Sequence, residues 1–330
     1  MAATMREERI FVTLEPDVMK ARRRAREMAA GLGFDEKETA GIETAVSELA
    51  TNLVVHRTFQ GEAILSVIDD VRGRGLEVRV RDKGPGIRDI GSAMRPGEST
   101  AGGLGIGLSG VRRFMDDFIL ESGPGQGTEI IAHKWLREGC LSNMEFSVFS
   151  VPKPGEDVSG DAYYIKRLCH SVTFSVIDGL GHGKEAHKAA SIALEILEEN
   201  HHEQIPLIIG RIHKALIPTR GAAMAICRIN FQSGKMEHLS LGNVETRVFG
   251  APSPVRPFSF NGTLGMAMES YRVIEYPYFL NSTVVMFSDG ISGRFDLDPL
   301  QLKLSPQEIG IFIFKGFARQ TDDATVLVGR

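Results

Sequence analysis

Cysteine is scarce in this chain of 330 residues, which has three, at Cys140, Cys169 and Cys227. No two of them have the spacing of a zinc site or a redox pair, and an odd, scattered set is typical of a reducing compartment. Uninterrupted apolar runs of about 18 residues are also missing, and the N-terminus has no apolar run, so neither a membrane span nor a signal peptide is expected. The sequence therefore predicts a cytoplasmic protein.

An excess of charge of one sign is missing too, because 38 basic and 42 acidic residues leave a net charge of −4. That balance gives no excess of positive charge of the kind that binds nucleic acid. The one dense basic run, within residues 22–26, lies between apolar residues at helical spacing and predicts a solvated helix face. Hydrophobic residues make up 42 % and charged residues 24 %, as in globular proteins, and the length predicts two domains.

A short polar segment near Arg137–Asn143 is the predicted domain boundary. Thr128–Trp135 before it resembles a closing strand, and Met144–Val151 after it alternates like an opening strand. We therefore expect one domain over residues 1–138 and another over residues 143–330. Both halves mix strands and helices without regular strand–helix–strand alternation, which favours the α+β class.

Hydrophobic periodicity places further elements in both halves. In the first half it predicts a helix over Thr39–His56, a strand over Leu76–Asp82 and a helix over Gly110–Phe118. In the second half it predicts a helix over Lys184–Asn200. Further strands are expected near Ala222–Asn230, Met236–Leu241, Thr283–Phe287 and Ala324–Val328.

Glu48 and Asn52 are four residues apart on the first predicted helix, so both side chains lie on one face. A carboxylate can accept a proton from a hydroxyl group. An amide oxygen can hold Mg²⁺ without adding negative charge near a phosphate. Taken alone, the pair is equally compatible with an ordinary polar helix face.

Asp82 ends a predicted strand and is followed by Lys83-Gly84-Pro85-Gly86. An aspartate at this place can accept a hydrogen bond from the exocyclic amine of a base. Gly84 and Gly86 allow the backbone to approach a ligand closely. A plain turn at the end of a strand gives the same pattern.

A glycine-rich segment, residues 102–108, opens another predicted helix. Backbone amides at such a helix start form a phosphate site, which Gly103, Gly105 and Gly107 would supply. Gly105, Gly107 and Gly110 also satisfy the G-x-G-x-x-G pattern of dinucleotide-binding folds. That pattern should follow a strand directly, whereas a loop precedes it here, so the dinucleotide interpretation is disfavoured.

In this order and spacing the three elements resemble the boxes of the GHKL ATPase family, over roughly residues 10–136. The local sequence is similar to the anti-sigma serine kinases of bacteria, including the stressosome switch kinases. The resemblance implies a Bergerat α/β sandwich that binds ATP and Mg²⁺, with Glu48 as general base, Asn52 as the Mg²⁺ ligand and Asp82 reading adenine. It also implies a Ser or Thr of a STAS-domain protein as phosphoryl acceptor. The other implied nucleotide contacts are Gly84, Gly86, Gly103, Gly105, Gly107 and Thr128.

Four aspartates of the second half stand at strand edges, namely Asp161, Asp178, Asp289 and Asp322. Each alone is common as a turn former. Four together suggest a cluster whose mutual repulsion cations would relieve, and hard cations prefer oxygen ligands. Two metal ions about 4 Å apart would hold a water molecule and polarise a phosphate.

The sequence around these aspartates resembles the protein phosphatase 2C superfamily, and most closely its sporulation-stage-II-E branch, over roughly residues 145–330. The resemblance implies an α-β-β-α sandwich with two Mn²⁺ or Mg²⁺ ions, and Asp178 as the catalytic residue that bridges both. Asp161 and the Gly179 carbonyl would serve one ion, and Asp289 and Asp322 the other.

Two further residues of this half are weaker candidates. Asp323, beside Asp322, is a less favoured metal ligand. His182, within Gly181-His182-Gly183, is either a proton donor or a plain residue at the start of a helix.

Together the two halves predict a bifunctional signalling protein of a bacterial partner-switching pathway, which phosphorylates and dephosphorylates Ser or Thr of STAS-domain partners. The implied partners are STAS-domain anti-anti-sigma or stressosome-scaffold proteins, with a sigma factor or another phosphatase as further candidates. Two alternatives stay open. The first domain either regulates the phosphatase through nucleotide binding alone, or is a partner-binding module of the anti-sigma kind.

Overall fold

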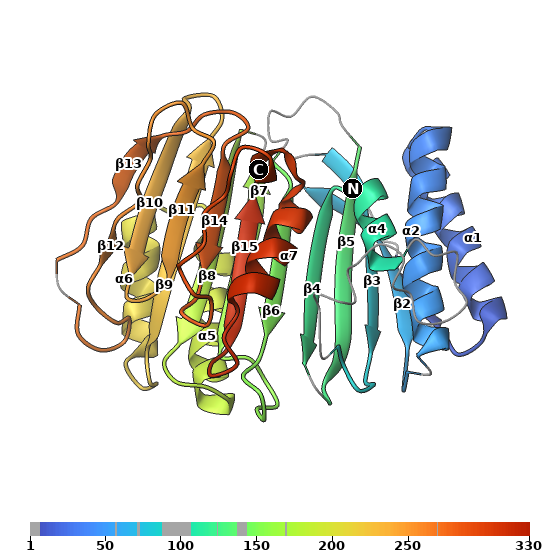
Figure 1. The fold of residues 1–330 in the computed structure, drawn as a ribbon, viewed down its shortest axis with the longest axis horizontal. Helices are drawn as coiled ribbons and strands as arrows, with labels where there is room; N and C mark the ends of the chain where they lie inside the picture. The colour runs from blue at the N-terminus through green and yellow to red at the C-terminus, as the bar shows by residue number, and fades with distance from the viewer. Residues whose placement is uncertain are drawn as a thin grey trace. The chain divides into compact units, whose positions relative to one another are not determined.

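The computed structural model describes residues 7–56, 58–70, 73–87, 107–123, 125–136, 144–168, 170–268 and 270–330. The chain divides into two compact units, Met1–Cys140 and Leu141–Arg330 (Figure 1). Each unit combines strands and helices, which confirms the α+β class. Within the described ranges, no helix is both long and apolar enough to cross a membrane.

The first unit is an antiparallel sheet with helices packed against it (blue to green in Figure 1). Helices α1 and α2 pack against each other and against the first strands, and α4 packs against α2. The strands in spatial order are β1 (Glu7–Phe11), β2 (Glu62–Asp70), β3 (Gly73–Asp82), β5 (Gly127–Trp135) and β4 (Asp117–Gly123). The helices are α1 (Glu15–Leu32), α2 (Glu36–Val55) and α4 (Gly107–Phe114). This layering confirms the predicted sandwich.

Helix α2 forms for reasons that are visible in the sequence. At its start Asp35 caps the helix, since its carboxylate accepts a hydrogen bond from Glu38 N at 2.7 Å. Ile42, Val46 and Leu49 are at most 1 % exposed and point into the core. The apolar face predicted from their spacing is confirmed, and α2 begins three residues before the predicted helix.

The helix predicted over Gly110–Phe118 is wrong at its end, because α4 stops at Phe114 and β4 starts at Asp117. The carboxylate of Asp116 accepts the backbone amide of Trp135 at 2.9 Å. Asp117 accepts the indole N–H of the same tryptophan at 3.0 Å. These bonds to β5 hold the segment in the sheet and override its local helical pattern. Strands β1 and β4 were not predicted at all.

The second unit has two sheets with helices outside them (Figure 1). Strands of the first sheet contact β7 and β8 of the second, α7 packs on the first sheet, and α5 and α6 cover the second. The first sheet runs β6 (Phe146–Val151), β15 (Ala324–Gly329), β14 (Thr283–Phe287) and β11 (Glu245–Phe249). The second runs β12 (Ser259–Phe260), β10 (Lys235–Leu241), β9 (Ala222–Asn230), β8 (Ser171–Gly179) and β7 (Asp161–Leu168), with β13 (Ile274–Pro277) also paired to β10. The helices are α5 (Lys184–Asn200), α6 (Ile205–Leu216) and α7 (Pro306–Phe317), with a short 3₁₀ turn at Gln301–Lys303.

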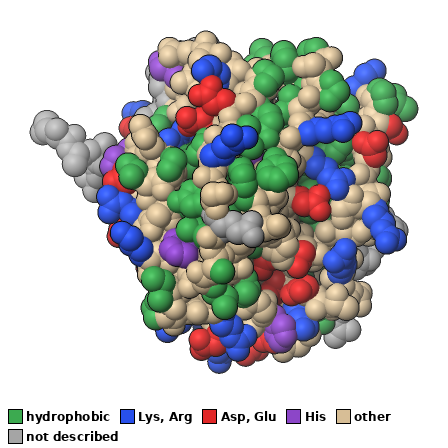
Figure 2. Space-filling model, turned by 90° about the vertical axis from the view of Figure 1, so that its left-hand side faces the viewer, with side chains coloured by type: hydrophobic (Ala, Val, Ile, Leu, Met, Phe, Trp, Pro, Cys, Tyr) green, Lys and Arg blue, Asp and Glu red, His purple; other side chains and the backbone are tan. Residues whose placement is uncertain are grey.

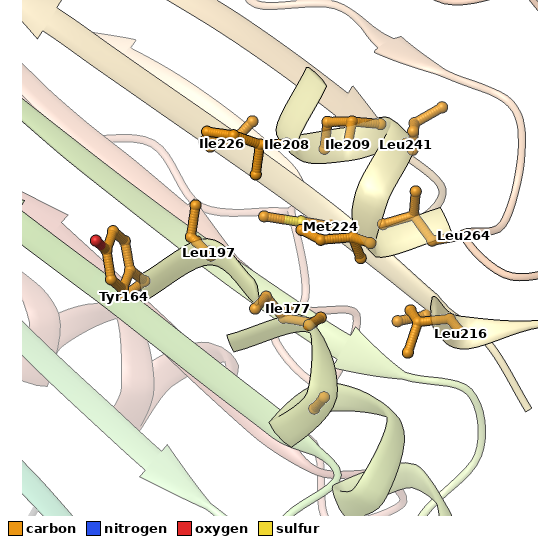
Figure 3. Packing of buried hydrophobic residues seen from close by; sticks show 14 of the residues in the cluster. Tyr164, Ile177, Leu197, Ile208, Ile209, Leu216, Met224, Ile226, Leu241 and Leu264 are labelled. Carbon is orange, nitrogen blue, oxygen red and sulfur yellow. The ribbon is translucent and has the colours of Figure 1, made fainter. Parts of the chain in front are cut away.

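A buried apolar cluster joins α5 and α6 to the sheet beneath them. Ile177 of β8 and Met224 of β9 lie opposite each other in the strand register and belong to the same buried cluster as Ile208 and Ile209 of α6 (Figure 3). Burying a side chain of this size stabilises a fold by about 1.5–3 kcal/mol. Because side chains alternate along a strand, Asp178, next to Ile177, faces the opposite side of the sheet. The cluster thus fixes the strand end that carries Asp178.

Most predicted elements of the second unit are confirmed. The helix over Lys184–Asn200 and the strands over Ala222–Asn230 and Thr283–Phe287 have the predicted ends. Strand β10 starts one residue early, and β15 continues one residue further. Helices α6 and α7 were not predicted.

Candidate functional site

Glu48 and Asn52 lie one turn apart in the C-terminal half of α2. Glu48 is buried, with 6 % of its surface exposed, and Asn52 is half-buried. After the helix the chain turns back to the end of β3, where the Phe59 carbonyl accepts a hydrogen bond from Lys83 N at 2.8 Å. The structure therefore brings the loop that follows α2 into contact with the loop after Asp82.

Asp82 is held in place by its own loop. Its carboxylate accepts a hydrogen bond from Gly84 N at 2.6 Å. Burial raises the pKa of Asp82, an effect that this hydrogen bond and the nearby His56 partly offset. A half-buried carboxylate with an oxygen to spare can accept a hydrogen bond from the amino group of a base.

Gly86 and Gly127 are required by the protein's own backbone. Both have left-handed backbones, with φ of 69° and 83°. A Cβ atom on Gly86 would lie 1.9 Å from the Gly123 carbonyl oxygen, and one on Gly127 would lie 1.9 Å from that of Asp82. The loop after β3 therefore packs closely against the β4–β5 hairpin. Glycine is thus needed at position 86 for this packing, in addition to the predicted close approach of a ligand.

Thr128 takes part in the same junction. Its hydroxyl lies 3.0 Å from the hydroxyl of Ser122. Ser122 Oγ also accepts Ile87 N at 2.8 Å and donates to the Gly127 carbonyl at 2.9 Å. Ser122, which the sequence did not single out, thus ties the loop to both strands. Gly103 and Gly105 lie outside the described residues, and Gly107 begins α4.

We expect Gly127→Ala to lower the free energy of unfolding by more than about 2 kcal/mol, because it adds a left-handed penalty of about 1–2 kcal/mol to a backbone clash. Displacing Asp82 should also abolish ATP binding. Thermal unfolding and titration with a fluorescent ATP analogue measure both effects. Gly125→Ala is the matched control, since Gly125 has φ of 82° but no described atom lies within 4 Å of its Cβ position. Equal losses in the two variants would show that the contact with Asp82 is not the constraint.

The second candidate site gathers aspartates from different strands. Asp161 begins β7 and is paired in register with Asp178 near the end of β8. Asp289 follows β14, and Asp322 precedes β15. Asp161 is 7 % exposed and Asp178 9 % exposed. The fold therefore brings the predicted carboxylates to one place.

The electrostatics of this cluster favour cations. Burial raises the pKa of Asp178 well above its usual range, and repulsion from Asp161, Asp289 and Asp322 raises it further. Burial likewise raises the pKa of Asp161. Crowded oxygen donors whose charges repel one another are what hard divalent ions prefer. The residues present thus fit the predicted metals. Within the described ranges, however, no three Asp, Glu, His or Cys side chains are already arranged so that they could hold a metal ion.

Neutral donors hold these carboxylates in the structure. Asn243 Nδ2 donates to Asp178 Oδ2 at 3.1 Å and to Asp289 Oδ2 at 2.6 Å. Ser288 Oγ donates to Asp161 Oδ2 at 2.6 Å. Asn243 is a site residue that the sequence did not identify, because only the turn after β10 brings it to strands that are distant in the sequence.

Asp322 and Asp323 differ in their burial and in the groups that they contact. Asp323 is 3 % exposed, and its carboxylate accepts the backbone amides of Lys153 at 2.8 Å and Gly160 at 2.9 Å. It therefore anchors the loop that leads to Asp161. Asp322 is half-buried and acts on the charge of Asp178, which suits the ligand role better.

The glycines that follow Asp178 and Asp289 are also packing residues. A Cβ atom on Gly179 would lie 2.1 Å from the carbonyl oxygen of Ala186 in α5. One on Gly290 would lie 1.9 Å from the carbonyl oxygen of Asp323. Absence of a side chain at these two positions lets the helix and the Asp323 loop close directly onto the aspartates.

His182 lies in the loop after Asp178 and is oriented by a carboxylate. Its Nδ1 is 2.5 Å from Glu156 Oε1, and its side chain is 44 % exposed. An exposed imidazole held by a carboxylate is the usual arrangement of an oriented acid or base. The contact with Glu156 orients His182, and both the proton donor and the plain helix-start residue remain open as interpretations.

Comparison with known proteins agrees with this division of the chain. Residues 11–134 match the family described as histidine kinase-like ATPase domain, and residues 170–330 match the family Stage II sporulation protein E (SpoIIE). The serine/threonine-protein kinase RsbT of Bacillus subtilis (strain 168) is 45 % identical over 128 residues, which are 39 % of this chain and 96 % of RsbT.

The second unit has relatives of its own. The phosphoserine phosphatase RsbX of the same organism is 26 % identical over 185 residues, 56 % of this chain and 92 % of RsbX. The crystal structure of RsbX in complex with magnesium superposes with a TM-score of 0.52 at 26 % identity, over 56 % of this chain and 94 % of that one. Over its first unit the chain therefore belongs to the family of the serine/threonine-protein kinase RsbT, and its second unit is similar to the SpoIIE family and to RsbX.

Proposed function

We propose that this chain sets the phosphorylation state of a serine or threonine on a STAS-domain partner protein. The first unit transfers the γ-phosphoryl group of ATP to that residue, and the second unit removes it. The observation that carries the proposal is that one chain holds a kinase-type unit matching 96 % of RsbT and a phosphatase-type unit matching 92 % of RsbX.

In the kinase unit, catalysis rests on positioning and charge neutralisation. Glu48 accepts the proton of the attacking hydroxyl group, and Asp82 holds the adenine amino group. Asn52 is the residue that would hold Mg²⁺, which neutralises phosphate charge when bound. Glu48 is 6 % exposed, so the proposed base is itself largely shielded from bulk water. Gly84, Gly86, Gly103, Gly105, Gly107 and Thr128 complete the proposed nucleotide site.

In the phosphatase unit, the residues proposed to hold two Mn²⁺ or Mg²⁺ ions are Asp161, Asp178, Gly179, Asp289 and Asp322. Such ions, when bound, polarise a phosphoryl group and activate water. Asn243 and Ser288 keep the carboxylates in position through the hydrogen bonds described above. His182, held by Glu156, gives a proton to the leaving serine or threonine oxygen.

The test is transfer of label from ATP to a STAS-domain protein encoded near this chain's gene. The Asp178→Asn chain is used so that product accumulates, and Glu48→Ala/Asp178→Asn is the control. We expect label to appear with the first and not with the second, and to disappear when the parent chain and Mn²⁺ are added. Absence of label despite measured ATP binding would instead make the first unit a regulator or a partner-binding module.

Covalent linkage of the two units adds a kinetic expectation. Tethering raises the effective concentration of one site for a partner just released by the other. The joined chain should therefore reset the partner's phosphorylation faster than the separated units mixed at equal concentration. Equal rates would show that the units act independently.

A further inference from the structure

Arg220 lies beside the loop that follows Asp178. Its guanidinium Nη1 is 3.1 Å from the position that a Cβ atom on Gly181 would take. The side chain is exposed, and in the part of the chain that the structure describes it has no hydrogen bond or ion pair. An unpaired cation thus lies beside the loop that follows Asp178.

The position of Arg220 is fixed by its backbone. It belongs to a turn in which Thr219 Oγ1 donates to the Leu216 carbonyl at 2.7 Å and accepts Gly221 N at 3.0 Å. The Gly221 carbonyl accepts Leu180 N at 3.0 Å, which ties the turn to the loop after Asp178. Gly221 has φ of 83°, and a Cβ there would lie 2.5 Å from the Leu264 carbonyl oxygen. The turn is therefore packed on both sides.

We propose that Arg220 is the phosphoryl-binding cation of the phosphatase unit. An arginine presents several N–H donors in a planar fork that matches phosphate oxygens, and it stays charged at any working pH. Arg220 contacts the oxygens of the phosphoserine or phosphothreonine that the carboxylate cluster hydrolyses. This inference rests on the proposed phosphatase function and adds the residue that recognises the anion.

Two exposed apolar side chains border the same turn. Ile217 is 61 % exposed and Met266 60 % exposed. Met266 Cγ is 3.3 Å from the Cβ position of Gly221, and Ile217 is part of the turn itself. Hydrophobic and charged side chains are mixed over the face of the second unit that carries β12 and β13 (Figure 2), so exposure alone does not distinguish these residues. Ile217 and Met266 are distinguished by their contact with the Arg220 turn. Apolar side chains beside an arginine fit a phosphorylated residue that is surrounded by apolar side chains of a folded partner protein.

The variants Arg220→Gln and Arg220→Lys test the proposal, with Arg256→Gln as the control on another exposed arginine of this unit. Hydrolysis of p-nitrophenyl phosphate and of a phosphorylated STAS-domain protein is measured at saturating Mn²⁺. We expect Arg220→Gln to raise KM about tenfold or more for both substrates, with kcat changed much less, because charge-assisted hydrogen bonds are lost. Arg220→Lys should restore part of the affinity. Ile217→Ser and Met266→Ser should raise KM for the phosphoprotein alone.

Binding of inorganic phosphate to the Mn²⁺-loaded chain, measured by calorimetry, gives a readout that does not need turnover. Binding weakened about tenfold in Arg220→Gln supports the proposal, provided that its melting temperature is unchanged. Unchanged KM and unchanged phosphate binding would overturn it, and so would a loss confined to the phosphoprotein. A parent chain that binds phosphate through Arg220 but hydrolyses neither substrate would instead contradict the proposed phosphatase function.

Discussion

Asp178→Asn is expected to abolish phosphatase turnover and at the same time to raise the melting temperature of the metal-free protein. Turnover should fall by about 10³-fold or more, as for other residues at the centre of a catalytic group. The gain in stability follows from the raised pKa of Asp178, which is 9 % exposed and lies near Asp161, Asp289 and Asp322, so that the folded chain must take up a proton there. An isosteric amide is neutral without that proton, which should be worth about 1–3 kcal/mol.

The same substitution should change the dependence of stability on pH. The pKa of Asp178 is raised above 3.8 in the folded chain, so the folded state holds a proton that the unfolded state releases. The stability of the metal-free parent should therefore fall as the pH rises from about 4 through the raised pKa, and the decline should be shallower in Asp178→Asn. Thermal unfolding across this pH range in the presence of a chelator measures it.

Glu199→Gln is the matched control for Asp178→Asn, because Glu199 is an exposed acid on α5 of the same unit. It should leave turnover and melting temperature unchanged. Mn²⁺ should stabilise the parent and the control more than Asp178→Asn, since a ligand that binds only the folded state raises its stability. An Asp178→Asn chain that is less stable than the parent without metal would contradict the argument from the raised pKa.

Glu48→Gln is expected to slow phosphoryl transfer by about 10²–10⁴-fold while leaving ATP affinity within a few fold. The amide keeps the size of the buried side chain but cannot take the proton of the acceptor hydroxyl group. Single-turnover transfer of label to the STAS-domain protein measures the rate, and titration with an ATP analogue measures the affinity. Phosphatase turnover should be unaffected, because Glu48 belongs to the other unit.

Two further variants serve as comparisons for Glu48→Gln. Glu36→Gln, at the exposed start of the same helix, should transfer as fast as the parent. Asp82→Asn should weaken ATP binding more than it slows transfer from bound ATP. Undiminished transfer by Glu48→Gln would mean that positioning alone drives the reaction and that the carboxylate is not the base.

Local sequence patterns predicted the elements whose own residues decide their structure. Helix α2 has a capped start and a regular apolar face, and β9 opens with a continuous apolar run, so both could be located. Helix α6 is apolar over much of its length, and period alone does not separate such a segment from a buried strand. The end of α4 was misplaced because Asp116 and Asp117 are bound by Trp135, a contact that no local pattern contains.

The candidate sites show the same limit. Aspartates at strand ends can be found one by one, since a polar residue after an apolar run is visible in the sequence. Asn243 could not, because its two partners lie 65 and 46 residues away along the chain. Glu156, which orients His182, is 26 residues from it. Gly86 and Gly179 were found, but the backbone atoms that exclude a side chain there are known only from the fold.

The presence of both units in one polypeptide has a consequence for the cell. Synthesis always delivers one kinase unit with each phosphatase unit, so random variation in the amount of protein changes both opposing rates by the same factor. The steady-state fraction of phosphorylated partner is then insensitive to expression level. It responds instead to whatever alters one unit alone, such as ATP, the supply of divalent metal, or a partner that covers one site.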